Sequence, residues 1–452
     1  MTHSPPDLPG AQTTDSPIDR ALTLLLADEP EAALRWSAAV VERDASIPSA
    51  LVITCRLLEQ MGRPEAAIEG FDLAVHRAID AGNLPLAVAA IADLRALGVN
   101  VEPSLAEVAE AFCLGSIRIQ DNETPPPPLP NLEGFQPLSS FLSGPALTSK
   151  ATQILHAATR EYREAEGTEL PLVAPLAFFS ALSKDALSDL VAAFEMITVP
   201  AGERVITAGE EGAEAYIVAR GELEVTRAND DDQERPVVLA RLVSGALFGE
   251  MALLSRAPRV ANVVATRPSI LLVAKRDALE AVAEKRPEVA VELAAHCRRR
   301  MVANLGRTSR VLIAVPPAER AILVERFETR SFERGDKLVV EGEEAQGLHL
   351  VASGEVAVVA HENGESIVVA TLPAGETVGE GALLLRRKAN ADVIAVHPTV
   401  TLFLPREEFL ELVEAHPSIL HGLYMTAVRR DDETTRALDS APASAAVDYV
   451  LL

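Results

Sequence analysis

The sequence contains few aromatic residues and far fewer basic than acidic residues. Aromatic side chains make up 4% of the 452 residues, and 41 lysines and arginines stand against 66 aspartates and glutamates, which gives a formal net charge of −25. Proteins that bind DNA or RNA directly need a basic surface, and those that bind single strands also stack bases on aromatic rings. Direct binding to nucleic acid is therefore not expected, and the same charge disfavours adsorption to anionic lipid.

Cysteine is scarce, and no long apolar run is present. The three cysteines, Cys55, Cys113 and Cys297, are far apart and form neither a disulfide framework nor a CxxC metal motif. The N-terminus has no basic stretch followed by an apolar run, and nowhere do about 18 apolar residues follow one another, as a membrane span requires. We therefore expect a cytoplasmic protein with buried thiols and no contact with a membrane.

Motifs for catalysis and for metal or cofactor binding are also missing. The sequence has no GxxxxGK[ST], HExxH or GxSxG motif, and its nine histidines form no cluster with ligand-like spacing. Nothing in it predicts an enzyme, a metal site or a bound cofactor.

The sequence does contain ample core material, in two different patterns. Hydrophobic residues make up 48% of the chain, and its length predicts two to four domains. From about residue 16 to residue 118, Ala and Leu recur with helical spacing. From about residue 171, short Val- and Ile-rich runs alternate with glycines and charged turns, which is typical of a small antiparallel barrel or jelly roll.

The helical part contains an internal repeat. The sequence PEAAL at positions 30–34 recurs as PEAAI at positions 64–68, and this offset is the period of a tetratricopeptide repeat. The second copy resembles that family, with Gly62 in the inter-helix turn and Ala67, Phe71 and Ala74 on one helix face. We expect a short repeat array that binds a protein partner; the alternative is an irregular helical bundle.

The barrel-like part is duplicated. Glycines 202, 209 and 221, each followed by Glu, recur with one constant offset as glycines 335, 342 and 354, and the Gly-Glu pair at 249–250 recurs at 379–380. The second copy is slightly shorter before this last pair, and the missing residues fall in a predicted hairpin tip, where insertions and deletions are tolerated. The sequence therefore predicts an α+β multidomain protein, with an N-terminal α-helical repeat region followed by two tandem β-barrel or jelly-roll domains with flanking helices. The expected segments are 1–15 (disordered), 16–118 (helical repeats), 119–148 (proline-rich linker), 149–306 (connecting helix and first barrel), 307–432 (second barrel) and 433–452 (tail).

One motif in the first barrel points to a function. Residues 248–261 (FGEMALLSRAPRVA) resemble the phosphate-binding cassette of the cyclic nucleotide-binding domain family, which includes catabolite-activator-type regulators and regulatory subunits of the cyclic-AMP-dependent protein kinase. The resemblance covers about residues 171–300 and again 315–430. The residues that it assigns to nucleotide binding are Phe248, Gly249, Glu250, Met251, Ala252, Arg259, Val260 and Ala261.

The chemistry of the cassette suits a cyclic nucleotide. Arg259 offers a fork of donors that matches two phosphate oxygens, and Gly249 allows the backbone to approach the ligand closely. Glu250 would repel a phosphate, so its presence makes sense if it accepts a hydrogen bond from a ribose 2′-hydroxyl. Val260 follows the arginine where relatives that prefer cyclic GMP commonly carry Thr or Ser, so cyclic AMP is the expected ligand. The alternative is that Glu250 and Arg259 pair with each other and close an empty barrel.

The second copy departs from this pattern. It keeps Gly379, Glu380 and Ala382 but carries Ala389 where the arginine belongs. Without that guanidinium a bound phosphate loses a charge-assisted, bidentate contact, so we interpret the second site as degenerate. Arg386, Arg387 or Lys388 could replace it, although such a cluster is more often a solvated loop tip.

Two outputs known in this family are not evident. No room for a winged helix-turn-helix follows the second barrel, and no Arg-Arg pair precedes Arg298, so an inhibitory Arg-Arg-x-Ser-like segment is missing before the first barrel. We therefore expect a cytoplasmic signalling adaptor that couples nucleotide binding in the first barrel to protein–protein interaction. The alternative is a scaffold whose barrels bind no nucleotide, and a further one is that a partner chain supplies the output.

Overall fold

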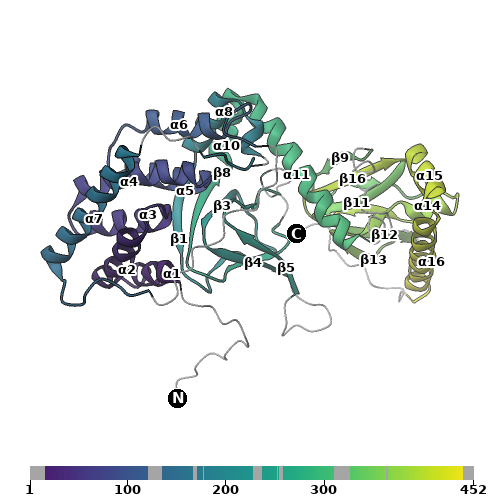
Figure 1. Cartoon of the computed structure of the whole chain (residues 1–452). Helices are drawn as coiled ribbons and strands as arrows, with labels where there is room; N and C mark the ends of the chain where they lie inside the picture. The colour runs from purple at the N-terminus through teal and green to yellow at the C-terminus, as the bar shows by residue number, and fades with distance from the viewer. Residues whose placement is uncertain are drawn as a thin grey trace, which may run out of the picture.

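The N-terminal part of the chain is a stack of α-helices (Figure 1). The structure is a computed structural model and describes residues 16–120, 135–165, 171–176, 178–227, 237–251, 253, 258–309, 326–362 and 365–440. The helices are α1 (Pro17–Leu26), α2 (Pro30–Arg43), α3 (Pro48–Gln60), α4 (Pro64–Asp80), α5 (Leu84–Ala96), α6 (Glu102–Phe112) and α7 (Gly144–Glu164). Each of the helices α1 to α7 carries a proline in its first turn, where its missing N–H costs no hydrogen bond.

The predicted repeat falls on equivalent helices. Helices α2 and α4 begin at Pro30 and Pro64, Ala33 and Ala67 are fully buried, and Gly62 lies in the turn before α4 with a φ of +79°. The helical region is thereby confirmed, whereas its membership of the tetratricopeptide class stays a prediction. Helix α7 packs against α2 and α4, so it belongs to the helical region and does not serve only as a connection to the first barrel.

The first barrel consists of two four-stranded antiparallel sheets, in the orders β1-β8-β3-β6 and β2-β7-β4-β5. Along strands such as β3 and β7, buried residues on the inner face alternate with less buried residues on the outer face. The buried positions explain why short Val- and Ile-rich runs form these strands. The strands are β1 (Glu195–Val199), β2 (Arg204–Ile206), β3 (Glu214–Arg220), β4 (Glu222–Arg227), β5 (Val237–Val243), β6 (Leu247–Phe248), β7 (Asn262–Ala265) and β8 (Ser269–Lys275). Helices α8 (Lys184–Ala192), α10 (Arg276–Lys285) and α11 (Pro287–Thr308) flank it.

The second barrel repeats this topology strand for strand. Its sheets have the orders β14-β11-β16-β9 and β10-β15-β12-β13, which are the orders of the first barrel with eight added to each strand number. The duplication predicted from the sequence is therefore confirmed. The elements are β9 (Glu328–Phe332), β10 (Lys337–Val339), β11 (Gly347–Ser353), β12 (Glu355–Glu362), β13 (Glu365–Pro373), β14 (Thr377–Val378), α14 (Glu380–Leu384), β15 (Asp392–Ala395), β16 (Thr399–Pro405), α15 (Arg406–Ala415) and α16 (Pro417–Ser440).

The helical region and the first barrel share one hydrophobic core. Helix α5 packs against β1, β3 and β8, and the core runs from the helices into buried residues of the sheet such as Ile217, Ile270 and Leu272. The second barrel has cores of its own, and α11 leads to it from the first barrel (Figure 1). The helical region is thus a fixed part of the first barrel's unit.

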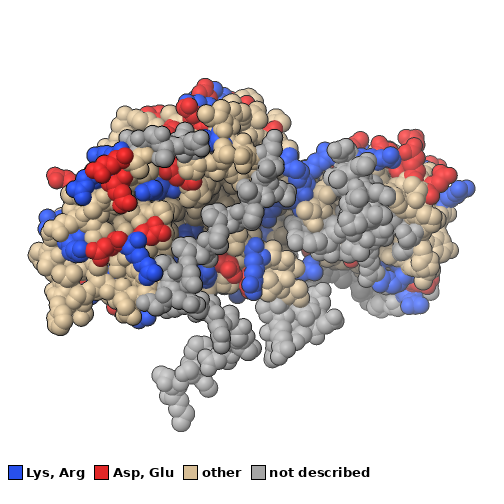
Figure 2. All heavy atoms as spheres, in the orientation of Figure 1, with Lys and Arg blue, Asp and Glu red and all other residues tan. Residues whose placement is uncertain are grey.

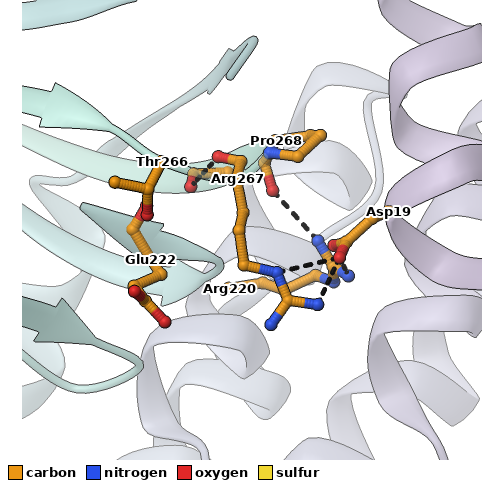
Figure 3. A network of polar contacts seen from close by, with 7 residues as sticks. Asp19, Arg220, Glu222, Thr266, Arg267 and Pro268 are labelled. Carbon is orange, nitrogen blue, oxygen red and sulfur yellow. Dashed lines mark hydrogen bonds and ion pairs between the residues drawn. The ribbon is translucent and has the colours of Figure 1, made fainter. Parts of the chain in front are cut away.

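A buried ionic cluster adds to this contact (Figure 3). Asp19 of α1 is 4% exposed, and its carboxylate accepts hydrogen bonds from Arg220 at the end of β3 and from Arg267 between β7 and β8. Arg220 also donates to the carbonyl of Pro268 at 3.0 Å. One carboxylate from the helices therefore pairs with two arginines of the barrel.

The predicted linker and chain ends fall only partly within the described residues. The proline-rich segment at residues 124–130 and residues 1–15 lie outside them. Of the predicted tail, residues 433–440 form the end of α16, and residues 441–452 are not described. All three cysteines are buried and unpaired. Among the described helices, none is both long enough and apolar enough to span a bilayer.

Candidate functional site

The cassette of the first barrel begins where β6 ends. Phe248 is 3% exposed and its ring stacks on that of Tyr216 in β3, with 5.2 Å between centroids. Gly249 follows with a φ of +78°, a conformation that other residues rarely adopt. A Cβ atom there would also lie 2.9 Å from Nη1 of Arg259 and 3.0 Å from the carbonyl oxygen of Glu214, so glycine is required for space as well as for conformation.

Arg259 is held in place by backbone carbonyls. Its side chain is 7% exposed, Nη1 donates to the carbonyl of Gly249 at 2.7 Å and Nη2 donates to the carbonyl of Glu214 at 2.8 Å. The carboxylate of Glu214 lies 3.5 Å from Nη2. Because a guanidinium has five N–H donors, these two hydrogen bonds leave donors for a ligand. Burial lowers the pKa of Arg259.

The backbone on either side of Arg259 is fixed by a second set of contacts. Its N–H donates to the carbonyl of Glu210 at 2.9 Å, and its own carbonyl accepts from the N–H of Gly209 at 2.8 Å. The guanidinium then passes directly over Gly212, where an added Cβ would overlap Nε, Cζ and Nη2 of Arg259. The turn before β3 therefore shapes a slot for this side chain.

Glu250 is buried, and its ionic partner is not the one considered from the sequence. It is 2% exposed, and burial raises the pKa of its carboxyl. Nε of Arg300, on α11, lies 3.4 Å from Oε1 of Glu250, while Nη1 of Arg300 donates to the carbonyl of Leu247. Glu250 and Arg259 therefore do not form a direct ion pair with each other, although the charge of each acts on the pKa of the other.

The other predicted cassette residues lie around these two. Ala261 is 5% exposed, Met251 is partly buried against Cys297 and Met301 of α11, and Val260 is 53% exposed at the surface. The N–H of Leu253 donates to the carbonyl of Glu250 at 3.1 Å, as in a first helical turn. Ala252 lies outside the described residues, as do residues 254–257.

The second barrel keeps the glutamate arrangement. Glu380 is 3% exposed, burial raises the pKa of its carboxyl, and Oε1 accepts from Nη1 of Arg430 on α16 at 2.6 Å. Arg430 also donates to the carbonyl of Thr377 and to Glu376. The offset in sequence from Arg300 to Arg430 equals that from Glu250 to Glu380, so both barrels use the same pair. The cassette motif does not include these arginines, but the shared offset in the sequence is a signal that could have revealed them.

At the position that corresponds to Arg259, the second barrel carries Ala389. Ala389 has the backbone contacts of Arg259, since its N–H donates to Glu343 at 2.9 Å and its carbonyl accepts from Gly342 at 2.9 Å. Ala382 is buried, and Gly379 has a φ of +91°. Residues 386–388 are exposed.

Other hollows lie away from the cassettes. One of about 480 Å³ lies between the helices and β1, and its lining includes Arg56, Asp93, Met196 and Thr198. Within the described ranges, no group of three or more His, Cys, Asp or Glu side chains is placed to hold a metal ion. On the face shown in Figure 2, acidic and basic side chains are intermixed over the helical region.

Comparisons with known proteins place both barrels in one domain class. The family model of the cyclic nucleotide-binding domain matches residues 196–286 and 329–416. Regulatory subunits of cAMP-dependent protein kinase from Yarrowia lipolytica and Neurospora crassa are 31% and 29% identical over 235 and 250 residues, which is 52% and 54% of this chain. The chain spans only 58% and 62% of the length of these curated relatives.

Similar domains occur among solved structures. The cAMP-bound regulatory domain of Toxoplasma gondii PKA is 26% identical, with 56% of this chain and 92% of that chain covered and a TM-score of 0.28. The N-terminal domain of a Streptomyces coelicolor transcriptional regulator is 29% identical, with 28% and 86% covered and a TM-score of 0.26. The match of the family model to both barrels shows that the chain has two tandem cyclic nucleotide-binding domains, and a helical region precedes them.

Proposed function

From two tandem cyclic nucleotide-binding domains, we propose that this chain binds one cyclic nucleotide, cyclic AMP, in its first barrel. The observation that carries the proposal is the placement of Arg259, a 7% exposed guanidinium that backbone carbonyls hold beside Gly249 and the buried Glu250. A buried cation with donors to spare suits an anion that enters with its own acceptors. The second barrel lacks that cation.

The two side chains divide the ligand between them. Arg259 donates to the exocyclic oxygens of the cyclic phosphate, and the carboxylate of Glu250 accepts from the ribose 2′-hydroxyl. The exposed Val260 offers no hydroxyl to a guanine, which favours adenine. Phe248, Met251, Ala252 and Ala261 complete the site, in the roles that the family resemblance assigns to them.

Helix α11 provides a route from the ligand to the second barrel. Arg300 contacts the carboxylate of Glu250, to which the ribose hydroxyl would also donate a hydrogen bond. A bound nucleotide therefore competes with Arg300 for this carboxylate and weakens the contact between Glu250 and α11. On the same helix, Cys297 and Met301 pack with Val400 of the second barrel and with Met251 of the cassette. The nucleotide therefore shifts the population between two packings of α11.

The output is an interaction with another protein. The similar kinase regulatory subunits suggest a regulatory role in signalling, in which the degenerate second barrel and the helical region supply docking surfaces. We propose that the chain acts in the cytoplasm, is not itself an enzyme, and is organised in the segments predicted from the sequence, with α7 added to the helical region.

Calorimetric titration of the full chain with cyclic AMP and with cyclic GMP tests the proposal. We expect about one equivalent of cyclic AMP per chain, weaker binding of cyclic GMP, and no binding after Arg259→Ala. Arg241→Ala is the matched control, because Arg241 lies on β5 of the same barrel with its side chain 68% exposed. Absence of heat with both nucleotides would contradict the proposal.

The alternative is a scaffold that binds no nucleotide, and the second barrel favours it because one site is already degenerate. A ligand that binds only the folded state raises the melting temperature. A melting temperature that millimolar cyclic AMP leaves unchanged would therefore support the scaffold.

A further inference from the structure

The slot that receives Arg259 depends on the absence of a side chain at Gly212. A Cβ at this position would overlap three atoms of the guanidinium group. Gly212 does not have a positive φ, so an alanine would be acceptable to the backbone itself. Space for Arg259, and not backbone conformation, is the demand that Gly212 meets.

In the second barrel, the positions that correspond to Gly212 and Arg259 both carry alanine. Ala345 corresponds to Gly212 under the offset that relates the glycines of the two barrels, and it precedes β11 as Gly212 precedes β3. It is 6% exposed and belongs to the same hydrophobic cluster that Ala389 packs against. By this correspondence, the Cβ of Ala345 would take the place that the guanidinium of Arg259 takes beside Gly212.

The remainder of the slot is preserved. Arg259 donates to the carbonyls of Glu214 and Gly249, and the corresponding residues are Gly347 and Gly379. A Cβ at Gly379 would lie 2.7 Å from the carbonyl oxygen of Gly347, which is the same close approach that Gly249 makes to Glu214. The second barrel thus retains both acceptors and has lost only the arginine and its space.

We propose that residues 212 and 259, and their counterparts 345 and 389, act as a pair that decides whether each barrel accepts the phosphate of a cyclic nucleotide. Gly212 is a positioning residue, because it acts through Arg259. The second barrel is closed to phosphate by two coupled substitutions, so an arginine at position 389 alone does not open it. This inference rests on the proposed binding of a cyclic nucleotide at Arg259.

The stoichiometry of cyclic AMP binding tests the pair. We expect Ala389→Arg and Ala345→Gly each to leave one equivalent per chain, and the double variant Ala345→Gly/Ala389→Arg to bind a second. In the first barrel, Gly212→Ala should weaken binding by about a hundredfold or more, because it removes a charge-assisted contact. A second equivalent with Ala389→Arg alone overturns the inference, as does undiminished binding by Gly212→Ala.

A ligand-free measurement separates this inference from the proposed function. In urea unfolding, Arg259→Ala should shift the midpoint less in the Gly212→Ala background than in the wild type, because the added methyl group has already displaced the guanidinium. Equal shifts in both backgrounds overturn the pair. If the wild type binds no nucleotide but the shifts are unequal, the proposed function fails and the steric pair stands.

Discussion

The ionic cluster between α1 and the first barrel leads to a quantitative prediction about stability. Asp19 has a side chain that is 6% exposed, and it pairs with Arg220 and Arg267, whose side chains are 13% and 25% exposed. Asp19→Ala would leave two neighbouring arginines without their shared carboxylate. Removing one partner of a buried ion pair costs about 3–5 kcal/mol, and the mutual repulsion of the arginines favours the upper half of that range.

The assay can follow the affected unit directly. The chain's single tryptophan, Trp36, lies in α2 and packs against the core shared by the helices and the first barrel. Urea unfolding monitored by its fluorescence therefore reports on this unit. We expect the free energy of unfolding to fall by about 4–5 kcal/mol in Asp19→Ala.

A surface pair in the same barrel gives the matched control. Glu195 pairs with Lys275 at 3.2 Å, but the two side chains are 66% and 61% exposed, so solvent screens the interaction. Glu195→Ala should cost about 1 kcal/mol or less. If Asp19→Ala costs no more than Glu195→Ala, the cluster does not hold the helices to the barrel and the reasoning is refuted.

Two further predictions concern titration and thiol reactivity. A hydrogen bond to Glu107 raises the pKa of His76 from its ordinary value of 6.5 to about 9. The contribution of His76 to the free energy of unfolding is therefore complete below pH 6.5 and is lost as the pH rises through 9. In urea unfolding followed by Trp36 fluorescence, His76→Gln should remove this part of the pH dependence. Burial raises the pKa of Cys297 to about 12, and the thiol packs against Val400 of the second barrel. In a variant that retains only this cysteine, the thiol should therefore react with a disulfide reagent at pH 8 only as fast as α11 separates from the second barrel. Rapid stoichiometric reaction of the native protein would contradict this packing.

The fold could be predicted from the sequence to a large extent because its signals are local. Proline at helix starts, glycine at turns and alternating Val and Ile residues each act within a few positions, and duplication made the barrel pattern visible twice. The cassette was recognisable for the same reason, since its residues are contiguous. The contact between the helices and the barrel could not be predicted, because its ionic cluster joins residues such as Asp19 and Arg267 that are 248 positions apart.

The contacts of a side chain in the site were predictable only where the residue that it contacts is close in the sequence. The Glu250–Arg300 pair involves a helix outside the cassette, so the sequence did not indicate it, and only the alternative interpretation gave Glu250 an ionic partner, Arg259. The role of Gly212 was missed for another reason. The pattern of glycines before each strand suggests turns, whereas the need for space arises only once the path of the Arg259 side chain is known.

The net charge of −25 poses a question for a protein whose proposed ligand is an anion, and the two cassettes answer it locally. Exposed charges beyond about 8 Å are largely screened at physiological salt, so the nearest groups decide. In the first barrel, Arg259 lies against the carboxylate of Glu214 and Arg300 against that of Glu250, and the charge of Arg276 also acts on Arg259. In the second, Arg430 faces two carboxylates, those of Glu376 and Glu380. A phosphate in the first barrel would therefore meet the guanidinium of Arg259, which is why overall acidity need not prevent binding there, whereas the second barrel has Ala389 at the corresponding position.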